Sequence, residues 1–197
     1  MERVRLAVRQ LIAVGVGAGV GAATAYGQGA LSDASTSLAN SAGPWCVAAF
    51  VVARYNRRLG PAIVGAMLTL ACCELGYVLA NELRSVATSR STVVFWLTAA
   101  IFAGPPVGVA GSWSMQSGWR RGTGIAVLGG VLLGEGVYGW STVSDTTDWR
   151  YWALEATIGA FVIVGAAVRT RRAIDATLSL VAGLATAAVV LLAGRLA

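Results

Sequence analysis

Long apolar segments, separated by short loops that carry arginine, constrain this chain more than any other feature. A helix needs about 20 mostly apolar residues to cross a bilayer. Seven segments are candidates for such helices: 6–27, 41–54, 60–81, 92–115, 121–141, 150–168 and 173–194. The second is short, and we expect it to begin in the preceding loop. The sequence therefore predicts an all-α, polytopic bundle of seven transmembrane helices that forms a single transmembrane domain over residues 1–197.

The charged residues support this interpretation and orient the chain. Only 12% of the residues are charged, whereas soluble domains have about a quarter. All 15 basic residues are arginine; eleven lie before or near the start of the first segment or in and beside the loops after the second, fourth and sixth, and four lie on the other side. Because positive loops remain in the cytoplasm, we expect an N-in/C-out, multi-pass protein of the cell membrane. The net charge of +6 then reflects topology, and no nucleic-acid partner is expected.

The chain resembles itself at an offset of 61 residues, which indicates repeated helical hairpins. The matching residues are Ala42, Gly43 and Pro44 with Ala103, Gly104 and Pro105, Glu74 with Glu135, and Tyr77 with Tyr138. Three sequential hairpins, each with an arginine loop, follow one leading helix; the third lacks the glutamate. Parallel repeats of this kind occur in membrane carriers.

Glycine pairs with GxxxG spacing predict close helix packing. The pairs are Gly15–Gly19, Gly17–Gly21, Gly104–Gly108 and Gly130–Gly134. Small residues allow helix backbones to approach each other in a membrane, where water does not drive helices together. These pairs predict structure and say little about chemistry.

Three glutamates interrupt apolar segments and are the candidate catalytic residues. At a rise of about 1.5 Å per residue, Glu74 and Glu135 lie about 21 Å from the cytoplasmic edge, and Glu155 about 7 Å below the outer edge. No arginine is predicted at that depth. Because an isolated charge in hydrocarbon is costly, we expect at least one of these acids to be protonated and able to donate a proton. The alternative is that each acid only hydrogen-bonds a neighbouring helix.

Aromatic residues are predicted near these acids and are candidates for substrate binding. They are Tyr77, Tyr138, Trp45, Trp140, Trp149 and Trp152. Each tyrosine lies three residues after a glutamate, on the same side of its helix. Aromatic rings stabilise cations, although interfacial tryptophans are also common in membrane proteins that have no such site.

With seven short spans, no separate soluble domain and glutamates inside the spans, the layout of the whole chain resembles the small integral-membrane terpene cyclases. These include the bacterial drimentine-type and fungal meroterpenoid cyclases. The resemblance implies an isomerase of terpenoid biosynthesis in secondary metabolism, in which an acid protonates a farnesyl-type prenyl chain and the chain closes into rings through carbocations. Glu74 or Glu135 would then be the acid, and the other carboxylates, including Glu155, would orient it or receive a proton.

The sequence argues against metal-dependent chemistry. Histidine is absent, so an ordinary zinc site is not expected. The aspartates Asp33, Asp145, Asp148 and Asp175 form no DDxxD motif of the kind that holds magnesium and a diphosphate in prenyltransferases. We therefore expect no metal and no cofactor.

Two other functions remain open. Repeated hairpins and intramembrane acids also describe proton-coupled carriers. Residues 57–70, RRLGPAIVGAMLTL, resemble stretches in the substrate-binding subunits of vitamin uptake systems. The second alternative is a structural membrane protein in which the acids only hold helices together. The cyclase hypothesis predicts the lipid bilayer and a prenylated small molecule as partners.

Overall fold

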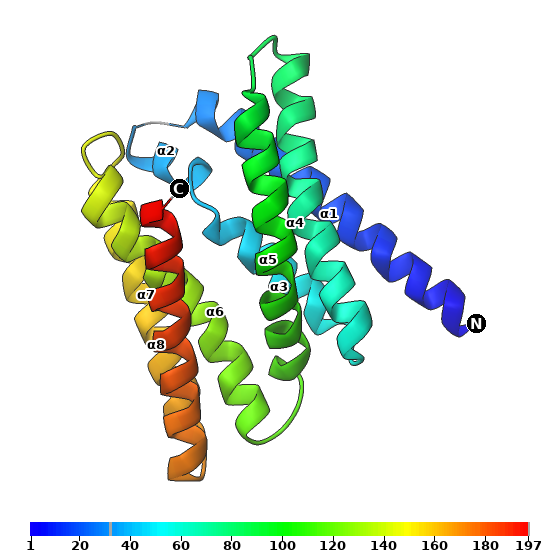
Figure 1. Ribbon diagram of the computed structural model, residues 1–197, viewed down its shortest axis with the longest axis vertical. Helices are drawn as coiled ribbons and strands as arrows, with labels where there is room; N and C mark the ends of the chain where they lie inside the picture. Colours follow the sequence, from blue (N-terminus) through cyan, green and yellow to red (C-terminus); the bar gives the residue numbers. More distant parts are fainter. Residues whose placement is uncertain (32, 197) are drawn as a thin grey trace. The chain divides into compact units, whose positions relative to one another are not determined.

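The computed structural model describes residues 1–31 and 33–196, and within these ranges every regular element is a helix (Figure 1). Residue 32, in the first predicted loop, and residue 197 lie outside the description. The elements are α1 (Glu2–Ala30), α2 (Asp33–Ala39), α3 (Gly43–Arg54), α4 (Leu59–Leu83), α5 (Arg90–Ser114), α6 (Trp119–Tyr138), the π-helical turn η1 (Gly139–Val143), α7 (Trp149–Val168) and α8 (Ala173–Leu196).

Six helices in the described part of the chain are long and apolar enough to cross a membrane: Val4–Ala30, Leu59–Leu83, Arg90–Ser114, Trp119–Val143, Trp149–Val168 and Ala173–Arg195. They match six of the seven predicted segments and confirm the all-α, membrane-type architecture. The remaining segment, 41–54, forms α3, which has 12 residues. A helix of that length rises about 18 Å, less than the hydrocarbon thickness of about 30 Å. The seventh span and the N-in/C-out orientation stay predictions.

The chain forms two compact units. The first combines Met1–Ala30 with Pro44–Ser112, and the second combines Leu31–Gly43 with Trp113–Ala197. The first unit therefore contains α1, α4 and nearly all of α3 and α5, and the second contains α2, α6, η1, α7 and α8. This division does not test whether residues 1–197 form a single transmembrane domain, which stays a prediction.

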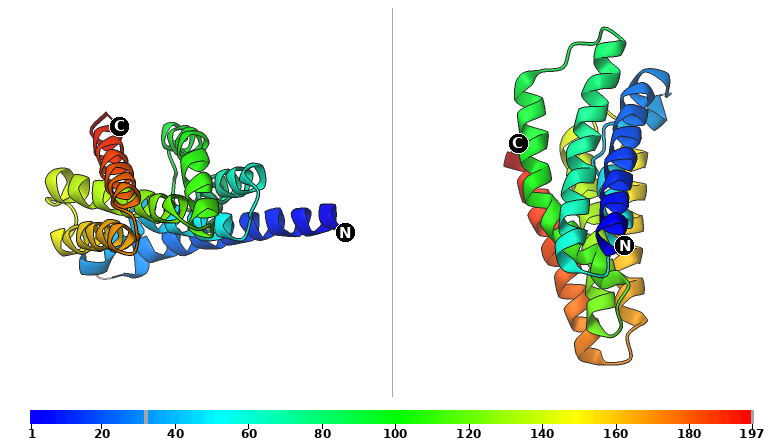
Figure 2. Two further views of the ribbon diagram at one scale, coloured as in Figure 1. Left: turned by 90° about the horizontal axis from the view of Figure 1, so that it is seen from below. Right: turned by 90° about the vertical axis from the view of Figure 1, so that its right-hand side faces the viewer.

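In the first unit, α1 crosses α4 obliquely through glycine contacts (Figure 2). A Cβ at Gly17 would lie 2.8 Å from the Cβ of Cys72, and a Cβ at Gly21 would lie 2.9 Å from the Cα of Cys73. On α4, Gly76 meets the backbone of Ala18 in the same way. The Gly17–Gly21 pair therefore packs as predicted.

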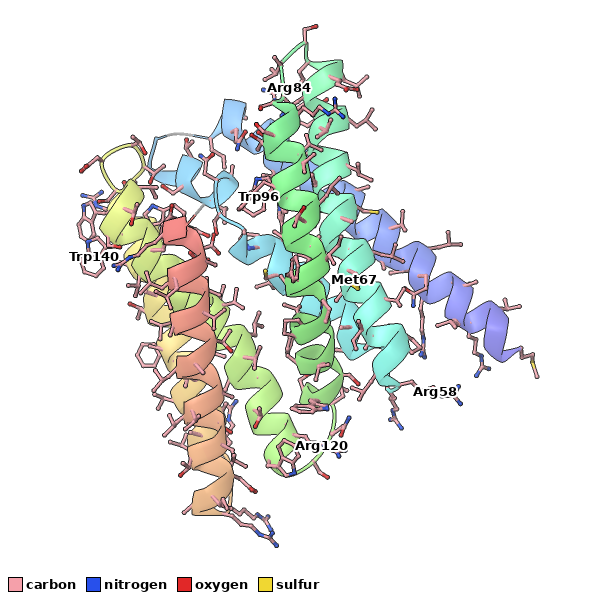
Figure 3. The ribbon with its side chains drawn as sticks, in the orientation of Figure 1. Arg58, Met67, Arg84, Trp96, Arg120 and Trp140 are labelled. Atoms are coloured by element: carbon pink, nitrogen blue, oxygen red, sulfur yellow. The ribbon has the colours of Figure 1, made fainter. Side chains whose placement is uncertain are left out.

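Helix α5 packs against α4 in the same unit. Gly104 lies against Met67, which Figure 3 labels, and Gly108 lies against Ile63. Gly108 follows Gly104 along α5, whereas Ile63 precedes Met67 along α4, so the two helices run antiparallel. This confirms the predicted pair Gly104–Gly108 as a packing contact.

In the second unit, α6 packs against both α7 and α8. Its pair Gly130–Gly134 faces α8, where a Cβ at Gly134 would lie 2.9 Å from the Cα of Ala187. Toward α7, Gly129 lies against the carbonyl of Gly159, and Gly136 meets Ala156. Glycines thus bring α6 within backbone contact of both neighbours, which fixes the rotation of α6 about its own axis.

Candidate functional site

Two of the predicted acids, Glu135 on α6 and Glu155 on α7, meet in the second unit. The chain between α2 and α3 passes beside both. The backbone N–H of Ala42 donates a hydrogen bond of 2.6 Å to Oε1 of Glu135. The hydroxyl of Ser41 donates a hydrogen bond of 3.2 Å to Oε1 of Glu155. Two carboxyl groups and a break between two helices therefore form one cluster, which we call the acid pair.

The start of α3 supplies the polar groups of this cluster. Ser41 accepts a hydrogen bond of 3.1 Å from the N–H of Gly43, as an N-cap residue does. The N–H of Ala42, directly before α3, donates to Glu135. Because the N-terminus of a helix carries partial positive charge, this contact stabilises an anionic carboxylate at Glu135.

Gly43 makes room for the acid pair. A Cβ at this position would collide with Oε1 of Glu155 and would lie 3.1 Å from Oε2 of Glu135. Both carboxyl groups therefore face the same point on the backbone, and any larger residue would displace them. This close approach, rather than backbone flexibility, requires glycine here.

Glu155 is buried, and in the described part of the chain only one of its two carboxyl oxygens has a hydrogen-bond partner. Its side chain is 5% exposed, whereas Glu135 is half-buried. Within the described residues, Oε2 of Glu155 has no hydrogen-bond partner. The Tyr151 hydroxyl, one helical turn earlier on α7, lies beside the Glu155 carboxyl and Ser41. A buried oxygen without a protein partner is uncommon, and a proton, a water molecule or a ligand can satisfy it.

Glu74, the third predicted acid, lies on α4 in the first unit. It is 1% exposed, and neither carboxyl oxygen has a hydrogen-bond partner among residues 1–31 and 33–196. The prediction that Glu74 takes part in catalysis stays a prediction.

The predicted aromatic residues of the second unit have individual packing partners. Trp140 and Trp149 are exposed, with their ring centroids 6.3 Å apart, and Figure 3 shows Trp140 at the outside of its unit. Trp152 is buried, and its indole N–H donates a hydrogen bond of 2.8 Å to Thr147. The ring of Tyr138 lies against α8, where a Cβ at position 194 would be 2.9 Å away. Their predicted role in substrate binding stays a prediction.

The two predicted aromatic residues of the first unit contact each other. The ring centroids of Trp45 and Tyr77 are 6.4 Å apart. Trp96, which the sequence analysis did not single out, lies 5.8 Å from Trp45. Trp45 donates a hydrogen bond of 3.0 Å from its indole N–H to Thr24.

Sequence reasoning missed the residues that hold the acid pair, namely Ser41, Ala42 and Tyr151. One signal was present, because Ala42 and Gly43 belong to the repeated Ala-Gly-Pro that was used only as a mark of internal similarity. The second copy of that motif lies inside α5, where Gly104 packs on Met67. The repeat thus pointed to a close backbone approach in both places, with an acid as the neighbour in only one.

The donor set of the acid pair suits protons better than metals. No group of three or more histidine, cysteine, aspartate or glutamate residues is arranged to hold a metal ion in the described part of the chain. Two carboxyl groups held by a hydroxyl and a backbone amide can share and transfer a proton.

Comparison with known proteins gives a family and no activity. No curated protein and no solved structure matches the chain. The match to the family DUF6518 covers residues 1–197, the whole chain. The chain therefore belongs to the DUF6518 family, which is described as a family of unknown function.

Proposed function

We propose that the acid pair is an intramembrane proton-transfer site and that the protein uses it as a metal-independent terpene cyclase. In this proposal Glu155 donates a proton to a farnesyl-type prenyl chain of a small molecule, and Glu135 is its anionic partner. The observation that supports the proposal most directly is the buried Oε2 of Glu155, which has no hydrogen-bond partner among the described residues, although Oε1 is held by Ser41.

Two features favour placing the proton on Glu155. Ser41 accepts from the N–H of Gly43, so its single hydroxyl proton donates to Oε1 of Glu155. Glu135 accepts from the backbone N–H of Ala42, directly before α3, which favours its charged form. Two adjacent carboxyl groups resist carrying a charge at the same time. Glu155 therefore carries the proton, and its unpartnered Oε2 is the place for it.

The proposed reaction moves one proton in and one out. The O–H bond of Glu155 breaks as the terminal alkene of the prenyl chain uses its π electrons to form a C–H bond, which leaves a tertiary carbocation. The next alkene attacks this cation and closes a ring. A carbon next to the last cation then loses a proton to a carboxylate of the pair, and a double bond forms. The product is an isomer of the substrate, and no oxidant or reductant is consumed.

The surroundings of the pair fit this chemistry. The carboxylate of Glu135 provides a fixed negative charge next to the site where positive charge develops. Tyr151, half-buried beside Glu155, adds an aromatic ring that can stabilise a cation. These groups would act on a prenylated small molecule that reaches the site from the lipid bilayer.

The same proposal includes the finer topology. We infer a multi-pass protein of the cell membrane with seven crossings, an N-terminus inside and a C-terminus outside. The seventh crossing would be α2, the break and α3 together, residues 33–54, which have enough length to span a bilayer with a discontinuity at Ser41. The arginines before the first predicted segment and around the loops after the second, fourth and sixth segments support this arrangement.

A second candidate function, a proton-coupled small-molecule carrier or transport subunit, is favoured by one feature. The break between α2 and α3 places the amide of Ala42 on an acid. Secondary transporters use interrupted helices of this kind, whose N-termini face anionic groups near the middle of the membrane.

The experiment uses the purified protein in liposomes with three substrates: a farnesylated indole, a prenylated quinone and a free polyprenol. Products are examined by mass spectrometry and NMR, because cyclisation leaves the mass unchanged and only the ring structure reveals it. We expect Glu155→Gln to lower the rate at least about 100-fold, the scale of general acid catalysis. Glu82→Gln, an exposed acid on α4, is the matched control. New rings formed by the Glu155→Gln protein at the unchanged rate would refute the mechanism.

The same liposomes test the carrier. If the wild-type protein forms no rings but accumulates a solute when a pH gradient is applied, and Glu155→Gln abolishes that accumulation, the carrier function replaces the cyclase.

A further inference from the structure

Glu74 forms a second site that the proposed proton transfer does not use. Its side chain is 1% exposed, yet both carboxyl oxygens lack a hydrogen-bond partner within the described ranges. Burying a polar group without a partner costs several kcal/mol, and burying an unpaired charge costs more. An arginine closes the same helix, but the guanidinium of Arg84 donates to the carbonyl of Ala25 and lies 5.2 Å from the ring centroid of Tyr26.

The antiparallel register of α4 and α5 shows what Glu74 faces. Met67 of α4 lies against Gly104 of α5. Seven residues further along α4 is Glu74, on the same helix face, and seven residues back along α5 is Leu97. Glu74 therefore lies on the α5-facing side of its helix, one residue from the level of Trp96, which Figure 3 labels on α5.

Three aromatic rings from three helices gather at this level. The ring centroid of Trp45 (α3) lies 5.8 Å from that of Trp96 (α5) and 6.4 Å from that of Tyr77 (α4), and both pairs are tilted, at 58° and 59°. The polar edges are used, because Trp45 donates to Thr24 and Tyr77 donates to Gln28. These hydrogen bonds hold the rings in place, and the tilts keep their π faces from stacking flat on each other.

We propose that Glu74, Tyr77, Trp45 and Trp96 bind a small organic ammonium ion, such as a methylated amine. Tyr77 lies one helical turn after Glu74, so an acid and an aromatic ring share one face of α4. An ammonium ion would neutralise the buried carboxylate and contact the negative faces of the rings, which is the way aromatic cages recognise methylated amines. The ligand carries the positive charge that the site lacks.

Binding is tested with the full chain in detergent, with tetramethylammonium as the probe and the change in tryptophan fluorescence as the signal. Neopentyl alcohol, which has a similar shape and no charge, is the matched ligand control. We expect saturable binding of tetramethylammonium, no binding of neopentyl alcohol, and an at least tenfold weaker affinity in Glu74→Gln. Trp96→Leu should also weaken binding, which provides a second variant if the first does not fold.

Two controls separate this site from the acid pair. Glu82→Gln, an exposed acid on the same helix, should bind the probe like wild type. Glu135→Gln should also retain binding, so loss of the proposed cyclisation and loss of the cation site are distinguishable. Absence of saturable binding in the wild type, or unchanged affinity in both Glu74→Gln and Trp96→Leu, would overturn the proposal and leave Glu74 as a protonated acid.

Discussion

Two glycines on the same helix, Gly19 and Gly21, allow a direct test of how α1 packs. A Cβ at Gly21 would lie 2.6 Å from the carbonyl carbon and 2.9 Å from the Cα of Cys73, both backbone atoms of α4. A Cβ at Gly19 would meet nothing within 4 Å among the described residues. Gly19→Ala and Gly21→Ala therefore add the same methyl group to the same helix. The two variants differ only in whether that methyl group meets a neighbouring atom.

The expected magnitude follows from two terms. Replacing glycine by alanine inside a helix stabilises it by about 0.5–1 kcal/mol, and this term is the same at both positions. Overpacking costs about 1–3 kcal/mol, and only Gly21→Ala incurs this cost because the backbone of α4 cannot move aside like a flexible side chain. Gly19→Ala should therefore be more stable than Gly21→Ala by about 1–3 kcal/mol.

The assay is the free energy of unfolding, measured on purified protein in mixed micelles by titration with dodecyl sulfate and followed by helical circular dichroism. Because the helix term cancels between the two variants, their difference isolates the collision with α4. A Gly21→Ala protein as stable as Gly19→Ala, or more stable, would refute this packing of α1 on α4.

Three further predictions concern the second unit. Gly43→Ala pushes Oε1 of Glu155, the end of a flexible side chain, off the hydroxyl of Ser41, so it should lower the free energy of unfolding by about 1 kcal/mol and slow ring formation by about 100-fold, as misplaced catalytic groups do; an unchanged rate would contradict the site. Ser41→Ala removes a helix cap and a hydrogen bond to the α7 glutamate, and should lower the free energy of unfolding by about 1–3 kcal/mol in the same titration. Thr147→Val leaves the buried indole N–H of Trp152 without its acceptor and should cost about 1 kcal/mol, whereas Thr146→Val, at an exposed hydroxyl, should cost less; equal effects would show that the indole bond is not the cause.

Much of the helical layout could be predicted from the sequence, because an apolar run of about 20 residues has few alternatives to a membrane helix. The predicted segment 150–168 and the observed helix Trp149–Val168 differ by one residue. The segment 41–54 was harder to predict, since its first residues are not helical. Ser41 and Ala42 instead donate hydrogen bonds to two acids on two other helices, and local hydropathy gives no sign of such tertiary contacts.

Only part of the candidate site could be predicted from the sequence. Glu135 and Glu155 stand out in the sequence because acids inside apolar runs are rare and costly. Ser41 and Tyr151 do not stand out, because serine and tyrosine are ordinary at helix starts and membrane interfaces. Their importance comes from the two carboxyl groups that lie beside them.

By itself, the sequence determined that this chain forms apolar helices with acids inside them, since the length and hydrophobicity of each run decide this locally. The tertiary structure alone decided which faces of those helices meet. Gly15 and Gly17 both begin GxxxG pairs but lie about 200° apart around α1, so only one pair can face α4. In the same way, the close packing of α6 on α7 decided that two acids 20 residues apart share one serine and one helix start. Spacing along a helix restricts which residues share a face, but only contact with a neighbouring helix selects the face that is used.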